Sequence, residues 1–192
     1  MKKIGIFLLI AVLLMVTGCS KGETAEQATV NALDAVKTLD KETLGKYMNY
    51  NELVESDDGS ESEYINKIFE NLDYKIISSE EKENEAVVKA DITNIDMEKV
   101  MGEAMKNSLA EVFSQAFSNL GEQQSEAESE DMFNEHFEQA IENNKDSKVV
   151  NTVDIKLTKV DEQWKINMDS DLQNALMGNL YRVANQLKDI FE

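Results

Sequence analysis

Apolar residues recur at helical spacing in the first third of the chain and predict three helices. Over residues 25–39 they fall on one helical face, behind a capping-box pattern formed by Thr24 and Gln27. Asp40 is placed to cap a second, shorter helix, and a third apolar stripe covers residues 64–72. We therefore expect three amphipathic helices before the first strand.

The spacing then alternates, which predicts two antiparallel β-hairpins. The first joins residues 74–79 to 85–95, and the second joins 149–158 to 164–168. Between the apolar positions stand Lys, Asp and Thr, so one face of the sheet is expected to be apolar and the other solvated. The apolar positions either pack on helices or line a crevice for a small ligand: Val88, Ala90, Ile92, Val153, Ile155, Leu157, Trp164, Ile166 and Met168.

Helical spacing returns between the two hairpins, over residues 97–120 and 131–144. The polar, acidic stretch between them, residues 121–131, is expected to be a flexible loop. The apolar stripe of the first segment has two interpretations, ordinary core packing or an adaptable methionine-rich contact surface. For the second interpretation the candidate residues are Met97, Met101, Met105, Phe113 and Phe117.

The segregation of helices and hairpins predicts an α+β fold with an antiparallel sheet packed on helices. A final helix, with Ser170 as its expected cap, closes the chain. We expect a single domain over residues 24–192, with residues 97–144 as a helical insertion.

The start of the chain has the pattern of a secretory signal. Lys2 and Lys3 precede the apolar run 4–16, which is 13 residues long. A membrane-spanning helix needs ~20 apolar residues, so this run is too short to span a bilayer comfortably. Two small residues then precede Cys19, the only cysteine, which therefore has no intramolecular disulfide partner.

The sequence VTGC, from Val16 to Cys19, resembles the lipobox of bacterial lipoproteins. The resemblance implies that residues 1–18 are a cleaved signal peptide and that the Cys19 thiol carries diacylglycerol with acyl chains such as palmitate. It also implies a short tether, residues 19–23, on the extracytoplasmic face of the cell membrane. Two acyl chains hold a protein stably at a bilayer, at ~0.8 kcal/mol per buried CH₂. Removing 18 of the 192 residues leaves 174, which suits one domain.

Two stretches of the body resemble small bacterial lipoproteins with a cone-like fold, of the nuclear transport factor 2-like and cystatin-like kind. They read NALDAVKTLDKETLGKYM (31–48) and IKLTKVDEQWKINM (155–168). Several such families from Gram-positive bacteria have unknown function. The insertion 97–144 and the final helix depart from the simplest cone, and a helix there could fill its mouth. Ketosteroid isomerase and scytalone dehydratase share the superfamily, but their catalytic residues have no matching motif here.

The net charge of the chain argues against nucleic acid as a partner. The chain carries 38 acidic and 19 basic residues, for a net charge of −19. Without Lys2 and Lys3 the basic count falls to 17, and the net charge is −21. Such a surface repels nucleic acid and anionic headgroups. We therefore expect no nucleic-acid partner, and a body held at the membrane by its lipid alone.

The sequence has no nucleotide-binding loop, zinc cluster or nucleophile elbow, so no metal and no cofactor beyond the lipid is expected. The acidic loop 55–63 contains a glycine, but its spacing fails the EF-hand calcium pattern. His136, the only histidine, lies at the edge of an apolar stripe and fits a boundary residue better than a general base. If the protein were an enzyme, its candidate groups would be Tyr47, Tyr50, Tyr64 and His136.

Together these observations favour a lipid-anchored binding or protein-interaction module without catalytic activity. Its expected partners are the membrane, through the lipid, and either a small apolar ligand or a cell-envelope protein. One alternative is a cone-fold enzyme of hydrolase, isomerase or dehydratase type, which needs a deep pocket with convergent polar groups. Another is an accessory solute-binding lipoprotein, although the usual two-lobed architecture needs a longer chain.

Overall fold

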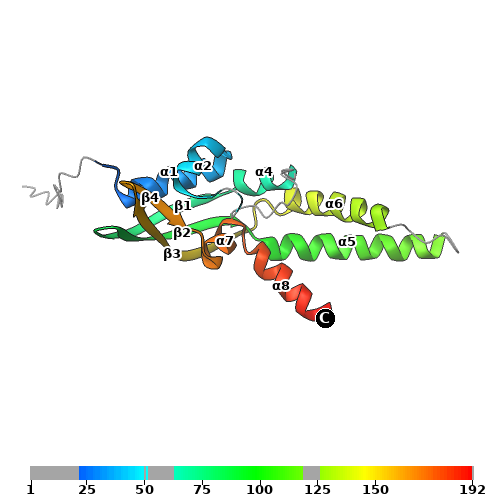
Figure 1. Cartoon of the computed structure of the whole chain (residues 1–192). Helices are drawn as coiled ribbons and strands as arrows, with labels where there is room; N and C mark the ends of the chain where they lie inside the picture. The colour runs from blue at the N-terminus through cyan, green and yellow to red at the C-terminus, as the bar shows by residue number, and fades with distance from the viewer. Residues whose placement is uncertain (1–21, 50, 52–62, 119–125, 192) are drawn as a thin grey trace, which may run out of the picture.

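A four-stranded antiparallel sheet with its covering helices forms one half of an elongated molecule (Figure 1). The computed structural model describes residues 22–49, 51, 63–118 and 126–191. The strands are neighbours in the order in which they occur along the chain: β1 (Asp73–Lys82), β2 (Glu85–Ile95), β3 (Lys148–Val160) and β4 (Gln163–Asn167). The predicted α+β class, with two hairpins in one antiparallel sheet, is confirmed.

Helices precede, interrupt and follow the two hairpins, as the spacing predicts. They are α1 (Ala25–Thr38), α2 (Lys41–Tyr47), α4 (Glu63–Glu70), α5 (Met97–Ser118), α6 (Glu126–Asn143), α7 (Ser170–Leu176) and α8 (Leu180–Phe191). The predicted capping box of α1 is present, since Thr24 Oγ1 accepts from the Gln27 N–H at 3.1 Å. Gln27 Oε1 accepts from the Thr24 N–H in return, at 3.2 Å. Asp40 caps α2 by accepting from the Thr43 N–H.

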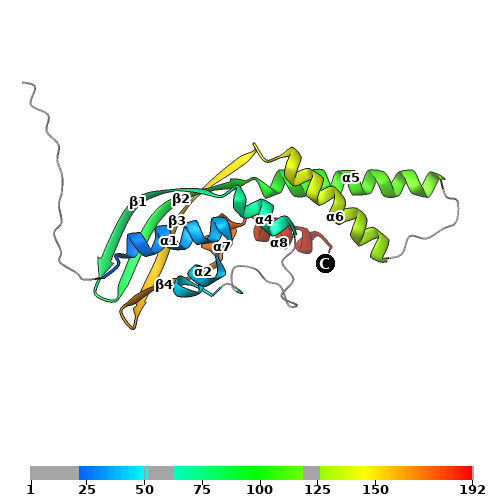
Figure 2. The same ribbon diagram turned by 90° about the horizontal axis from the view of Figure 1, so that it is seen from above.

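One face of the sheet is buried and the other is open to solvent, as the alternation predicts. Helices α1, α4 and α7 cover the buried face, which Figure 2 shows from above. Trp164 and Phe69 are the largest side chains buried there. The outer face carries polar side chains and scattered exposed apolar ones, such as Val87. Lys89 and Asp154 form an ion pair across β2 and β3 on this face.

The predicted final helix is broken into α7 and α8, and its cap lies one residue earlier than expected. Asp169, not Ser170, accepts from the N–H of Leu172 at the start of α7. Gly178 and Asn179 then adopt left-handed backbone conformations, with φ of 57° and 71°. The Gly178 carbonyl accepts from the N–H of Met97, which ties this break to the end of β2. Such a close backbone approach requires glycine, and spacing alone gives no sign of it.

Helices α5 and α6 form an arm that leaves the sheet at the end of β2 (Figures 1 and 2). They occupy most of the residues 97–144 that were expected to form a helical insertion. The first turns of α5 are buried through Met97, Val100 and Ala104. Beyond Ala104 the helix runs on past the core, and its 22 residues span about 33 Å.

Candidate interaction surfaces

The side chains expected to line a crevice form the packed core of the sheet. Eight of the nine are buried, and Met168 is partly buried against them. Trp164 is 1% exposed, and its indole Nε1 donates to the carbonyl of Glu23 at 3.1 Å. A ligand would reach these residues only if the helices above them moved.

The five candidate residues on α5 differ in burial between the two halves of the helix. Met97 is fully buried, and Met101 and Met105 are partly buried. Phe113 is 64% exposed and Phe117 is 83% exposed. The core interpretation therefore describes the inner half of α5, whereas the outer half presents its aromatic side chains to solvent.

Leu109 and Val112 join Phe113 and Phe117 on the surface, with exposed fractions of 55% and 41%. Their spacing of three, four and eight residues places the four side chains on one side of the helix. We call these four residues the arm stripe. A contiguous apolar surface of this kind is typical of a contact site for another molecule.

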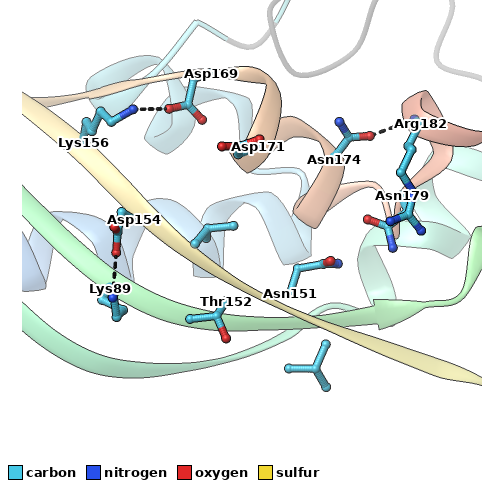
Figure 3. Close-up of a pocket in the computed structure, with 12 residues that line it drawn as sticks. Lys89, Asn151, Thr152, Asp154, Lys156, Asp169, Asp171, Asn174, Asn179 and Arg182 are labelled. Atoms are coloured by element: carbon cyan, nitrogen blue, oxygen red, sulfur yellow. Dashed lines mark hydrogen bonds and ion pairs between the residues drawn. The ribbon is translucent and has the colours of Figure 1, made fainter. Parts of the chain in front are cut away.

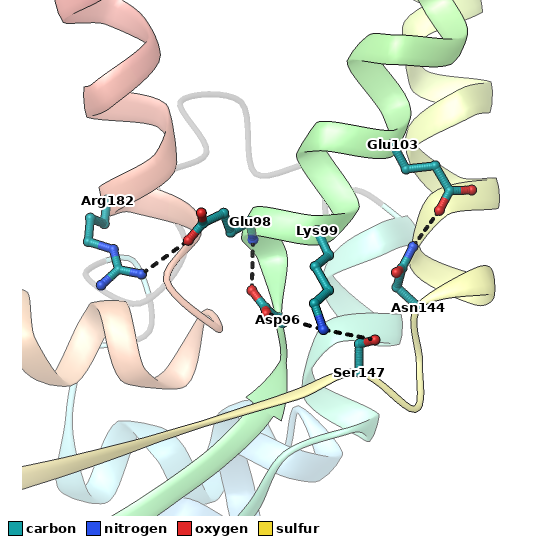
Figure 4. A network of polar contacts seen from close by, with 7 residues as sticks. All are labelled: Asp96, Glu98, Lys99, Glu103, Asn144, Ser147 and Arg182. Carbon is teal, nitrogen blue, oxygen red and sulfur yellow. Dashed lines mark hydrogen bonds and ion pairs between the residues drawn. The ribbon is translucent and has the colours of Figure 1, made fainter.

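The base of the arm is fixed by polar contacts from three directions (Figure 4). The Asp96 N–H donates to the Ser147 carbonyl at 2.8 Å, which joins the start of α5 to the start of β3. Arg182 of α8 lies 3.7 Å from the Glu98 carboxylate. On the other side, Glu103 accepts from the side-chain amides of Asn143 and Asn144, and these bonds lower the pKa of its carboxyl group.

Aromatic and polar contacts also join α6 to its neighbours. The Phe137 ring makes a T-shaped contact with Tyr64, on α4, with ring centroids 5.2 Å apart, and stacks on Phe133 at 6.0 Å. Farther out, His136 Nε2 lies 2.8 Å from a carboxylate oxygen of Glu111 on α5. These contacts set the direction of the arm relative to the sheet.

The arm is strongly acidic on the α6 side. This helix contains seven Asp or Glu residues and no Lys or Arg. Helix α5 adds Glu98, Glu103 and Glu111 but only two lysines. Together, the two helices of the arm carry ten Asp or Glu residues against two lysines.

The side chains considered for catalysis lie on separate elements. Tyr47 is on α2, where its hydroxyl donates to a Glu23 carboxylate oxygen at 2.8 Å. Tyr64 is on α4 and His136 on α6, and Tyr50 lies outside the described residues. Within the part of the chain that the structure describes, no hydrogen bond or ring contact joins any two of Tyr47, Tyr64 and His136.

Glu23 fastens the expected tether to the opposite end of the molecule from the arm. Its carboxylate accepts from both Tyr47 and the Asn31 side chain, and its carbonyl accepts from Trp164. The N–H of Ala25 donates to Glu81 near the β1–β2 turn. The start of α1 and the β-hairpin turns therefore share one end of the molecule, and Figure 2 shows the arm at the other. Cys19 itself lies outside the described residues.

A second surface, which the sequence analysis did not find, is an open groove beside β3 (Figure 3). Its volume is about 570 Å³, and it runs between β3 and the segment that contains α7 and the start of α8. Its lining residues were assigned to strand faces and to a helix, and no spacing rule places them together. The lining includes Lys89, Asn151, Thr152, Asp154, Lys156, Asp169, Asp171, Asn174, Asn179 and Arg182.

The described residues form neither a metal cluster nor a membrane-spanning helix. Across residues 22–49, 51, 63–118 and 126–191, no group of three or more His, Cys, Asp or Glu side chains is arranged to hold a metal ion. None of the helices in these ranges has the length and apolar character needed to cross a bilayer. The acidic loop 55–63 lies almost wholly outside the described residues.

Comparisons with known proteins give one structural similarity. No family model and no curated protein matches the chain. A crystal structure of ycdA from Bacillus subtilis subsp. subtilis, provisionally described as a lipoprotein, aligns with a TM-score of 0.40 and 17% identity. The alignment covers 86% of this chain and 47% of that chain, so this chain corresponds to about half of its length. At this level the similarity supports no inference about function.

Proposed function

We propose that this chain is a lipid-anchored, extracytoplasmic protein-interaction module without catalytic activity. Lipidation at Cys19, after removal of residues 1–18, retains it at the cell membrane. The α+β body serves as a rigid spacer, and the α5–α6 arm contacts the partner. The lipobox-like sequence at Cys19 supports the anchor, and the arm stripe supports the contact.

The observation that carries the proposal is the exposure of Phe113 and Phe117 on a helix that extends past the core. Burying a large apolar side chain is worth roughly 1.5–3 kcal/mol, and the monomer leaves both phenylalanines largely in water. Helix α5 packs on the core through its first turns and on α6 farther out, but neither contact buries Phe113 or Phe117, so packing within the monomer gives these two positions no reason to be apolar. Binding of a partner supplies that reason.

The charge of the arm indicates the chemistry of the partner. A second copy would bring two acidic α6 helices together, and an anionic membrane would repel them in the same way. A protein surface with an apolar patch and a basic overall charge complements the arm stripe and the acidic character of the two arm helices. We therefore propose a different protein of the cell envelope as the partner.

The position of the arm suits this role. Strand β2 and helix α5 follow one another in nearly the same direction, and together they extend roughly 70 Å. Glu23 holds the tether at the sheet end, only four residues after Cys19. The proposed anchor thus leaves the arm stripe facing away from the bilayer surface.

The cone-like fold implied by the resemblance enters the proposal only as architecture. Support for it comes from the sheet with helices on one face. A ligand pocket inside the cone is not part of the proposal, because the residues expected to line it are buried in the core.

Co-purification from detergent-solubilised membranes tests the proposal. The full chain and its Phe113→Ser/Phe117→Ser variant are purified side by side, and the proteins bound to each are quantified. The matched control, Val87→Ser/Val160→Ser, removes two apolar side chains that are 42% and 48% exposed on the outer face of the sheet. A partner retained by wild type and control but lost from the arm variant is the expected result. Identical recovery from all three proteins would rule out the arm stripe as the contact.

A further inference from the structure

Strand β3 has one neighbour along most of its length. It pairs with β2 from Lys148 to Thr158, but β4 covers it only from Lys156 to Val160. In the described part of the chain, no other backbone or side-chain group donates to or accepts from the backbone between Lys148 and Ile155. The first eight residues of β3 therefore form an open sheet edge.

The turn between β3 and β4 identifies which backbone groups face this edge. Asp161 and Glu162 have φ of 49° and 63°, as in a two-residue type I′ hairpin, so Val160 and Gln163 form the closing hydrogen-bonded pair. In an antiparallel ladder such pairs recur at every second residue. Counting back along β3, the N–H and C=O groups of Val150, Thr152 and Asp154 point to the uncovered side.

The other sheet edge is protected, whereas this one is not. Strand β1 contains a register shift between Ile76 and Ser78, and several of its residues are charged. Bulges and charges are devices that keep an edge from pairing with another strand. The open part of β3 has no bulge and no proline, and its stretch VVNTV, residues 149–153, carries no charge.

The groove in Figure 3 lies against this edge. Asn174 and Arg182 form part of the facing wall. A second complete copy would bring its own sheet and helices to that wall, so the groove favours a single extended segment over a dimer. The buried Nδ2 of Asn151, which belongs to the same lining, lacks a hydrogen-bond partner among the described residues.

The charges of the groove and of the whole chain indicate which kind of segment would bind. Lys89 is paired with Asp154, Lys156 with Asp169, and Arg182 with Glu98. The remaining charged residue of the lining, Asp171, has no ion pair within the described ranges. The charged residues of the lining are thus three acidic and three basic, and the preference for a basic segment comes from the net charge of the chain, which is −19.

We infer that the open edge of β3 binds an extended, basic polypeptide segment of another protein as a fifth strand of the sheet. The segment pairs with the backbone of Val150, Thr152 and Asp154, and a basic side chain of the segment meets Asp171. Strand addition of this kind draws affinity from backbone hydrogen bonds and specificity from alternate side chains. This site is separate from the arm stripe and does not rest on the proposed function.

Hydrogen exchange with synthetic peptides tests the inference. The full chain in non-ionic detergent micelles is mixed with an octapeptide of alternating lysine and valine. One control peptide replaces lysine with glutamate, and another is N-methylated at alternate backbone positions. The expected result is at least tenfold slower exchange at the amides of residues 150, 152 and 154 with the lysine peptide alone.

Two substitutions keep the test specific to the backbone. Val150→Pro removes an N–H that faces the open edge, which an edge strand tolerates, and should abolish the protection at residues 152 and 154. Val150→Ile keeps that N–H and should bind as wild type does.

Asp171→Asn tests the charge preference. It should weaken lysine-peptide binding several-fold and reduce its salt dependence.

Absence of protection with the lysine peptide at millimolar concentration would overturn the inference. Equal binding of the N-methylated peptide would also overturn it, since that peptide lacks the backbone donors. Protection of the same amides that appears without peptide and grows with protein concentration would assign the edge to a second copy instead. The peptide controls keep the inference testable even if Val150→Pro fails to fold.

Discussion

At the scale of single residues, the break between α7 and α8 depends on Gly178. A Cβ added there would lie 2.0 Å from the Ile95 carbonyl oxygen, and the φ of 57° is strained for any other residue. We expect Gly178→Ala to destabilise the protein by about 2 kcal/mol or more in urea denaturation.

Gly102→Ala provides the matched control for that substitution. Gly102 lies inside α5 with nothing within 4 Å of an added Cβ, so alanine there should stabilise by roughly 0.5–1 kcal/mol. Equal effects of the two substitutions would contradict the account of the α7–α8 break.

Tyr74 gives a prediction about alkaline pH. Burial, and the hydrogen bond that its hydroxyl donates to Asp34 at 2.8 Å, raise the pKa of Tyr74 to about 12. An unfolded tyrosine has a pKa of about 10, so the folded state favours the neutral phenol. The resulting stability is complete below pH 10 and declines as the pH rises towards 12.

Denaturation of wild type and Tyr74→Phe across this pH range measures the effect. The difference in unfolding free energy between the two proteins should shrink between pH 10 and about 12, because only the wild type loses this contribution. A difference that stays constant across the range would show that Tyr74 does not titrate differently in the folded protein.

The helix caps and Gly178 differ in how well the sequence predicts them. The Thr24–Gln27 capping box and the Asp40 cap follow from local spacing and are present. Asp169 as the cap of α7 was missed by one residue, because Ser170 is an equally good cap by type. Gly178 gave no signal, since its role depends on a carbonyl more than 80 residues away in the chain.

At the scale of elements, the arm shows that the spacing of apolar residues does not distinguish a buried helical face from an exposed one. An apolar stripe has the same spacing whether it packs into a core or lies in water. Met97 and Phe117 belong to one stripe, yet the first is 0% exposed and the second 83%. The distinction depends on where α5 leaves the sheet, which is a property of the tertiary structure.

The two halves of the arm should respond differently to substitution. We expect Phe113→Ser/Phe117→Ser to change the free energy of unfolding by less than about 0.5 kcal/mol per residue, because the folded monomer leaves both rings exposed. Phe137→Ala, at the buried base of the arm, should cost about 3 kcal/mol. Urea denaturation measures both, and a large loss in the Ser/Ser variant would show that the outer half of α5 is packed.

The sheet was the most predictable element. Both hairpins and the apolar face follow from alternation alone, and the register pairs apolar residues such as Val88 with Ile155. The shortness of β4, and therefore the open edge of β3, was not predictable, because it depends on where the chain turns into α7. The local sequence pattern predicts the strands. It does not predict the groove, because the position of the groove depends on where β4 and α7 begin and end.

At the scale of the whole molecule, the proposed anchor and the proposed contact surface lie at opposite ends. Glu23 holds the start of the body near the hairpin turns, and the arm extends the other way. The proposed anchor follows from the sequence, but its separation from the arm follows only from the fold.

Cys19→Ala tests the anchor. Without the thiol no diacylglycerol can be attached, so the protein should move from the membrane fraction to the soluble fraction on cell fractionation. Cys19→Ala combined with Phe113→Ser/Phe117→Ser separates lipid anchoring from retention by a partner. Membrane retention of this triple variant at the wild-type level would contradict anchoring through the lipid.

Photo-crosslinking in intact cells tests the central claim most directly. Photoactivatable benzoylphenylalanine replaces Phe117 at the tip of the arm or, as a control, Val160 on the outer face of the sheet. The account predicts one adduct with a different membrane-associated protein from position 117, which is lost when Phe113→Ser is added and is absent from position 160. Adducts of the same kind from both positions, an adduct with the mass of two copies of this chain, or no adduct from position 117 would contradict it.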